Sequence, residues 1–270
     1  MSAIVRFNRS LAARHALDLA VRLLALLAVT LLIMAAAPGW AAEPRHVLVF
    51  GDSNSWGWEP VKEGFPVRRY PLAQTWPQQL AKALGPQVVL HTDALSGRTV
   101  DLDFPADTHI GTLVDVDFNG RRALPAAVAR ELPLDLVIIM LGTNDLQHDF
   151  GRSPEAIAES AMQLAKLARE SGGGVFTRYA KPPQVLVVAP PPLGDTSATP
   201  IRQYYDDDAI ARSRRLGEAF LAAGKAAGVP VFDAGSVTAT GGIDGIHLTP
   251  ANHRALARGV LPEVRELLRE

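Results

Sequence analysis

Three short segments of the chain carry side chains that could together perform acyl transfer. They are Gly51-Asp52-Ser53, Gly142-Thr143-Asn144-Asp145 and Asp244-Gly245-Ile246-His247. A serine nucleophile needs a histidine base, an acid that orients the base, and hydrogen-bond donors for the developing oxyanion. Each segment taken alone is more typical of an ordinary turn or helix cap. Together they supply every required group, in the order Ser, Asp, His, which is one of the orders found in such triads.

The composition narrows the classes of protein that fit. The chain has 270 residues, 48% of them hydrophobic, with a net charge of -1 and no cysteine. This length is enough for one large α/β domain, and the near-neutral charge does not favour nucleic acid as a partner. The lack of cysteine excludes disulfides, thiolate nucleophiles and cysteine-ligated metals. His247 and His253 lie six residues apart without a third ligand, so we expect no metal site and no cofactor.

The amino terminus predicts an export signal rather than part of the fold. Four arginines lie within residues 1–22, and an apolar run over residues 23–37 ends on small residues. This layout is typical of a secretory signal peptide over residues 1–41, with cleavage expected after Ala41 or one residue later. The alternative is an uncleaved membrane anchor, for which the apolar run is short. Both interpretations place the remaining domain, residues 42–270, outside the cytoplasm, in the periplasm or the medium.

The rest of the chain alternates apolar runs with amphipathic stretches. Strands are predicted over residues 46–50, 87–90, 136–141, 185–189 and 229–232. Helices are predicted over 75–84, around 124–132, from Ser153, within 206–227, and from Thr249-Pro250 towards Leu268. Because strands that are apolar throughout need cover on both faces, we expect a single three-layer α/β/α sandwich with about five parallel strands. The three segments then follow strand ends, where open α/β sheets bind ligands.

These segments, with Ser96-Gly97-Arg98-Thr99, resemble the four blocks of the SGNH (GDSL-type) hydrolases. The resemblance is strongest to the bacterial arylesterase, acyltransferase and perhydrolase branch, through Trp56-Gly57-Trp58 and Pro190-Pro191-Pro192-Leu193. It implies a flavodoxin-like sandwich in which Ser53 is the nucleophile, His247 the base and Asp244 its orienting acid. It also implies oxyanion donors from the backbone amides of Ser53 and Gly97 and from the side chain of Asn144. Asn54 departs from the family pattern, because a bulky aliphatic residue usually follows the serine.

The function implied by this resemblance is a serine ester hydrolase for small, acetyl-type acyl groups. An acyl-enzyme on Ser53 would pass its acyl group to water, to an alcohol or to hydrogen peroxide. Trp56, Trp58, Phe150 and Pro192 are expected to form apolar walls of the substrate pocket. Two alternatives stay open: an envelope esterase that deacetylates polysaccharide, and a non-catalytic envelope protein on the same scaffold. A small ester is the expected partner, and a homo-oligomer is left open.

Overall fold

The computed structural model describes residues 18–27, 43–64, 68–105, 116–171, 181–241 and 243–269. The chain divides into two units, Met1–Glu43 and Pro44–Glu270. In the first unit, residues 18–27 form an exposed helix. No helix among the described residues combines the length and the apolar character needed to cross a membrane. Most of the predicted leader, including the expected cleavage site after Ala41, lies outside the described residues.

The second unit is built on the predicted five-stranded parallel sheet. Its strands are β1 (Arg45–Gly51), β2 (Val88–Ala94), β3 (Leu136–Met140), β4 (Gln184–Ala189) and β5 (Val231–Asp233). Their order across the sheet is β2-β1-β3-β4-β5, and every neighbouring pair is parallel. The central strands β1, β3 and β4 are almost fully buried, whereas the edge strands β2 and β5 are only half-buried.

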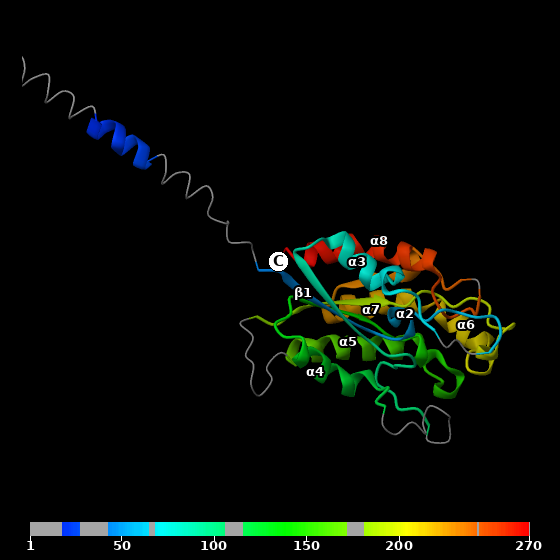
Figure 1. The fold of residues 1–270 in the computed structure, drawn as a ribbon. Helices are drawn as coiled ribbons and strands as arrows, with labels where there is room; N and C mark the ends of the chain where they lie inside the picture. The colour runs from blue at the N-terminus through cyan, green and yellow to red at the C-terminus, as the bar shows by residue number, and fades with distance from the viewer. Residues whose placement is uncertain are drawn as a thin grey trace, which may run out of the picture. The chain divides into compact units, whose positions relative to one another are not determined.

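Helices cover both faces of this sheet, which confirms the predicted three-layer sandwich. α4 (Gly120–Arg130), α5 (Pro154–Glu170), α6 (Asp207–Ser213) and α7 (Leu216–Ala227) contribute to the core on one face. α3 (Trp76–Leu84) and α8 (Pro250–Leu267) contribute to the core on the other face, and they lie together opposite α4 and α5 (Figure 1). Successive strand residues alternate between the two cores: Phe50 and Ile139 face the first, and Val49 and Ile138 face the second.

The helix starts follow from local capping chemistry. The Ser153 hydroxyl accepts a hydrogen bond from the Ala156 amide, and Pro154 occupies the first helical position of α5. Thr249 and Asn252 form a capping box at the start of α8. Shorter helical turns complete the unit: α2 (Ser53–Trp56), η1 (Leu72–Gln74), η3 (Asn144–Leu146), η4 (His148–Phe150), η5 (Pro200–Gln203) and η6 (Ala234–Ser236). Among these, α2 and η3 come shortly after the ends of β1 and β3 and carry Ser53 and Asn144.

Candidate active site

Ser53 lies where β1 turns sharply into α2. The Asp52 side chain caps α2 by accepting a hydrogen bond from the Asn54 amide at 2.9 Å. The turn requires glycine at position 51, because a Cβ there would lie 2.2 Å from the Ser55 hydroxyl oxygen. Ser53 is only 4% exposed, so its hydroxyl is held in a nearly closed environment.

His247 connects the Ser53 hydroxyl to a buried carboxylate. The His247 Nε2 atom lies 3.0 Å from Ser53 Oγ, and its Nδ1 atom lies 2.7 Å from Asp244 Oδ2. The other Asp244 oxygen accepts hydrogen bonds from the amides of Ile246 and His247, both at 2.9 Å. Gly245 permits this tight turn with a φ of 79°, because a Cβ there would lie 2.5 Å from the Asp195 carbonyl oxygen.

The electrostatics of this turn keep Asp244 ionised. Burial on its own raises the pKa of the Asp244 carboxyl, but the hydrogen bonds and charge of His247 and the two backbone amides outweigh it and hold the pKa below its usual value. A carboxylate at Oδ2 favours the tautomer that carries its proton on Nδ1 of His247. Nε2 is then free to accept the proton of the Ser53 hydroxyl, as a general base does.

Asn54 holds the His247 turn from the opposite side, a role that the sequence did not reveal. Its Nδ2 donates to the Ile246 carbonyl at 3.3 Å, and its Oδ1 accepts from the Leu248 amide at 3.0 Å. The two contacted residues, Ile246 and Leu248, are the neighbours of His247 in the chain. Asn54 is only 1% exposed. The sequence signal was the polar residue at a position that is usually aliphatic in the family that the sequence resembles.

Gly97 and Asn144 lie around the same pocket as Ser53. Gly97 has a φ of 86° in a turn closed by the Arg98 amide, which donates to the Leu95 carbonyl at 3.1 Å. The Asn144 Nδ2 donates to the Arg98 carbonyl at 2.9 Å. An amide nitrogen carries two hydrogens, so the second one can serve a ligand in the pocket. The structure thus brings the predicted oxyanion donors to one place.

Two buried ionic groups join the loops that carry these donors. Arg98 donates to the Gly51 carbonyl at 3.1 Å and pairs with Asp93 at 2.8 Å, which links the ends of β1 and β2. Asp145, fully buried, accepts from the Val100 amide at 3.0 Å and from Arg152 at 3.0 Å. Burial raises the pKa of Asp145 to about 7 despite these contacts. The sequence alone indicated no role for Asp145, although this residue directly follows Asn144.

A cavity of about 260 Å³ opens beside Ser53 and His247. Its described walls are mainly apolar or aromatic and include Trp58, Phe118, Ile201, Tyr204, Tyr205 and Ile246. The Trp58 ring stacks on the His247 imidazole, with centroids 5.0 Å apart and planes 4° apart. Trp58 therefore contacts His247 and also lines the cavity.

The other three residues predicted for the pocket are not among its described lining residues. Trp56 makes an edge contact with Trp58 and lies beneath the Arg69 guanidinium, 5.1 Å from the ring centroid. Phe150 packs on Phe104, which in turn packs on the wall residue Phe118. The Pro192 carbonyl accepts a hydrogen bond from the Thr240 amide at 3.1 Å. Trp56 thus packs against the wall residue Trp58, and Phe150 packs against Phe104, which contacts the wall residue Phe118.

The second histidine considered in the sequence, His253, lies in the core. Its Nδ1 accepts a hydrogen bond from the Trp76 amide at 3.2 Å, and burial lowers the pKa of His253 to about 4, so the ring is neutral. No cluster of His, Cys, Asp or Glu within the described ranges could hold a metal ion.

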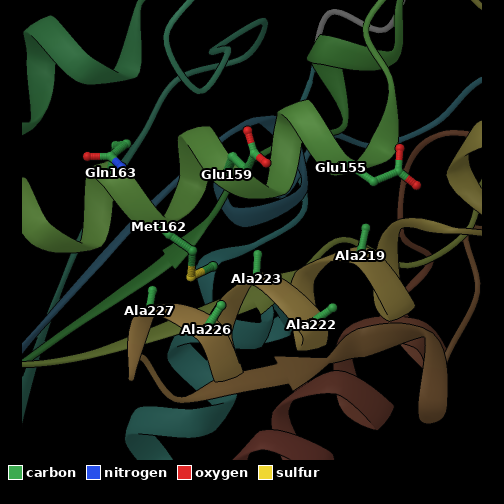
Figure 2. A pocket seen from close by; sticks show the side chains of 9 residues that line it. All are labelled: Glu155, Glu159, Met162, Gln163, Ala219, Ala222, Ala223, Ala226 and Ala227. Carbon is green, nitrogen blue, oxygen red and sulfur yellow. The ribbon is translucent and has the colours of Figure 1, made fainter.

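A second hollow, of about 460 Å³, lies between α5 and α7 (Figure 2). Its lining includes alanines of α7 and Glu159, Met162 and Gln163 of α5, of which Met162 points towards α7 (Figure 2). Its described lining shares no residue with the pocket at Ser53 and contains no pair of nucleophile and base. The described residues of this hollow therefore lack the groups that acyl transfer requires.

Comparisons with known proteins match the chain to one family and to several solved structures. The model of the GDSL-like lipase/acylhydrolase family matches residues 49–255. The solved aryl esterase of M. smegmatis is 41% identical, with a TM-score of 0.75 over 83% of this chain and 99% of that one. Est24, a carbohydrate acetylesterase from Sinorhizobium meliloti, is 40% identical, with a TM-score of 0.74 over the same shares of the two chains. Among curated proteins, the chain has no match.

Proposed function

The chain belongs to the GDSL-like lipase/acylhydrolase family and is an esterase, and within that family we propose that it cleaves small acyl esters through an acyl-enzyme on Ser53. The observation that carries this proposal is the hydrogen-bonded chain from Ser53 Oγ through His247 to Asp244, beside an apolar cavity that Asn144 also lines. Nucleophile, base, orienting acid and oxyanion donor therefore lie in one place, as acyl transfer requires.

In the acylation half of the reaction, Ser53 Oγ attacks the ester carbonyl carbon while His247 Nε2 takes the hydroxyl proton. The negative charge that develops on the carbonyl oxygen is stabilised by the free Nδ2 hydrogen of Asn144 and by the backbone amides of Ser53 and Gly97. Asp244 stabilises the imidazolium without taking its proton. The tetrahedral intermediate then collapses, His247 gives its proton to the leaving alcohol, and the acyl group stays on Ser53.

In the second half, His247 removes a proton from the acceptor, which attacks the acyl-enzyme and releases Ser53. Water gives the acid, an alcohol gives a new ester, and hydrogen peroxide gives a peracid. The choice between them depends on how well the pocket excludes water and holds an apolar acceptor. The aromatic walls at Trp58, Phe118 and Tyr205 support transfer to an alcohol alongside hydrolysis.

The size of the cavity supports a small acyl group. Its volume of about 260 Å³ lies below the range of about 300 to 1,000 Å³ that is typical of sites for drug-sized ligands. An acetyl-type group fits the apolar space next to Ser53, and a long acyl chain would have to leave it. We therefore expect rates to fall as the acyl chain grows.

A second candidate is a carbohydrate acetylesterase, which would use the same residues on an acetylated sugar. The solved structure of Est24, at 40% identity, supports it. Export of the domain by the predicted leader, residues 1–41, would bring either enzyme into contact with envelope or extracellular esters.

The proposal is tested first with variants of the three residues. Ser53→Ala and His247→Ala should each lower kcat on p-nitrophenyl acetate by about 10⁶-fold, and Asp244→Asn by about 10⁴-fold, without additive loss in combination. Full turnover by purified, folded Ser53→Ala would refute the acyl-enzyme. Rates of the native protein on p-nitrophenyl acetate, on longer-chain esters and on acetylated xylan then distinguish the two substrate classes.

A further inference from the structure

The orientation of the Asn144 side-chain amide decides whether it can serve the oxyanion. An asparagine amide turned by 180° keeps almost the same shape but exchanges its NH₂ group for its oxygen. In the turned form, Asn144 would point a lone pair at the developing negative charge and repel it. Some contact must therefore hold the amide the right way round.

We propose that Tyr205 is a positioning residue that holds the Asn144 amide with its nitrogen towards the substrate. The Tyr205 hydroxyl donates to Asn144 Oδ1 at 3.1 Å, while Asn144 Nδ2 donates to the Arg98 carbonyl at 2.9 Å. Both the nitrogen and the oxygen of the Asn144 amide are thus hydrogen-bonded, and the oxygen accepts from Tyr205, which lies 61 residues away in the chain. This inference rests on the proposed function, because it assigns Tyr205 a role at the same oxyanion site.

A third contact sets the direction in which the Tyr205 hydroxyl donates. The Gln147 Nε2 donates to the Tyr205 hydroxyl oxygen at 3.3 Å. A tyrosine hydroxyl has one hydrogen, and with its oxygen already accepting from Gln147 that hydrogen is directed at Asn144. All three side chains are buried, so water offers them little competition for these hydrogen bonds.

Tyr205 is itself fixed and keeps its proton. Its carbonyl accepts from the Thr196 hydroxyl at 2.8 Å, and its amide donates to the Ile201 carbonyl at 3.2 Å. Asp206, the next residue, caps α6 by accepting from the Ala209 amide at 2.8 Å. Burial raises the pKa of Tyr205 above its usual value, so the hydroxyl stays a donor over the working pH range.

The test is Tyr205→Phe in the full-length protein, assayed on p-nitrophenyl acetate. The variant keeps the ring in the pocket wall and removes only the hydroxyl that Asn144 accepts from. Because the Arg98 carbonyl still holds the nitrogen end, we expect kcat to fall by a moderate factor of about 3- to 10-fold, with KM changed less than about twofold. Binding of phenylboronic acid, which forms a tetrahedral adduct on an active serine, should weaken by a similar factor.

A double-mutant cycle separates positioning from a general structural effect. In an Asn144→Ala background, Tyr205→Phe should cause no further loss of kcat, since its target is gone. The same loss in both backgrounds would overturn the inference, and so would a raised KM with unchanged kcat, which would make Tyr205 a substrate contact. Gln147→Leu is the second variant: it frees the hydroxyl to rotate and should lower kcat by about 2- to 3-fold, only while Tyr205 is present.

These results are distinguishable from a failure of the proposed function. If Ser53→Ala is inactive while Tyr205→Phe has native kcat and native boronate affinity, only the role of Tyr205 is refuted. If Ser53→Ala keeps its turnover, the acyl-enzyme itself is refuted, and the role of Tyr205 with it. Thermal unfolding of each variant confirms that the rates compare folded proteins.

Discussion

Replacement of Asn54 by leucine tests whether the His247 turn is held by side-chain hydrogen bonds. Asn54→Leu is close in volume but removes the donor to the Ile246 carbonyl and the acceptor for the Leu248 amide. Each buried group left without a partner costs about 1–3 kcal/mol, and the burial of the leucine side chain offsets about 1.5–3 kcal/mol of that cost. We therefore expect the free energy of unfolding to fall by about 1–3 kcal/mol.

The same change should slow catalysis without weakening substrate binding. The two lost contacts flank His247, so the turn would loosen and Nε2 would move from its position 3.0 Å from Ser53 Oγ. A displacement of about 1 Å in a catalytic group can cost about 100-fold in rate. We expect kcat on p-nitrophenyl acetate to fall by about 10- to 100-fold. KM should hardly change, because Asn54 is not among the described residues that line the pocket.

Urea unfolding and steady-state kinetics of the purified variant measure both effects. Ser153→Ala serves as the matched control, because it removes the cap of α5, costs about 1 kcal/mol of stability and should leave kcat unchanged. A native kcat in Asn54→Leu, whether or not the protein is destabilised, would refute the argument that this side chain positions His247. An equal loss of kcat in Ser153→Ala would attribute the effect to general destabilisation instead.

Three further predictions concern the oxyanion donor, a buried carboxyl and the acyl acceptor. Asn144→Ala should lower kcat by about 10²- to 10³-fold with little change in KM, and a raised KM with native kcat would make it a ground-state contact. Burial raises the pKa of Asp52 from 3.8 to about 6, which corresponds to about 3 kcal/mol of stability that is present below pH 3.8 and lost as the pH rises through 6. Asn at this position does not titrate, so the Asp52→Asn variant should not lose this stability. Urea unfolding should therefore show the free energy of unfolding of the variant, relative to that of the native protein, increasing between pH 4 and 7. A difference that stays constant over this pH range would contradict the prediction. Trp58→Ala should shift the products of vinyl acetate and benzyl alcohol in water from benzyl acetate towards acetic acid, and an unchanged ratio would contradict a water-excluding role for this wall.

The layers of the fold were predictable because burial leaves a pattern along the chain. The apolar runs at β1, β3 and β4 are nearly continuous, since these strands are covered on both faces. Element ends were less predictable. The helix expected around 124–132 begins at Gly120 because Asn119 caps it, with its side chain accepting from the Arg121 amide. The last strand begins at Val231, after Pro230, which lacks the amide hydrogen that a sheet ladder uses.

The supporting contacts of the site were not predictable from the pattern of residues. Ser53, His247 and Asn144 lie in motifs whose residue types indicate acyl-transfer chemistry. In the structure all three line the same pocket. Asn54 and Tyr205 act on partners 192 and 61 residues away. Such contacts depend on how loops cross in space, and a polar side chain at one position carries no sign of its distant partner. The same holds for the walls of the pocket: Phe150 packs on Phe104, which packs on the wall residue Phe118.

The buried polar contacts also explain how loops can form a precise site. Irregular segments are usually mobile, yet an oxyanion site works only when its donors are in place before charge develops. Here Arg98 and Asp145 join the loops after β1, β2 and β3, while Asn54 joins α2 to the turn before α8. The hydrogen bonds of Asn54 to Ile246, of Arg98 to the Gly51 carbonyl and of Asp145 to Val100 are buried, so breaking one would leave an unpaired polar group and cost about 1–3 kcal/mol. Alternative loop arrangements are thereby disfavoured, and under the proposed mechanism the donors would need no rearrangement when a substrate binds.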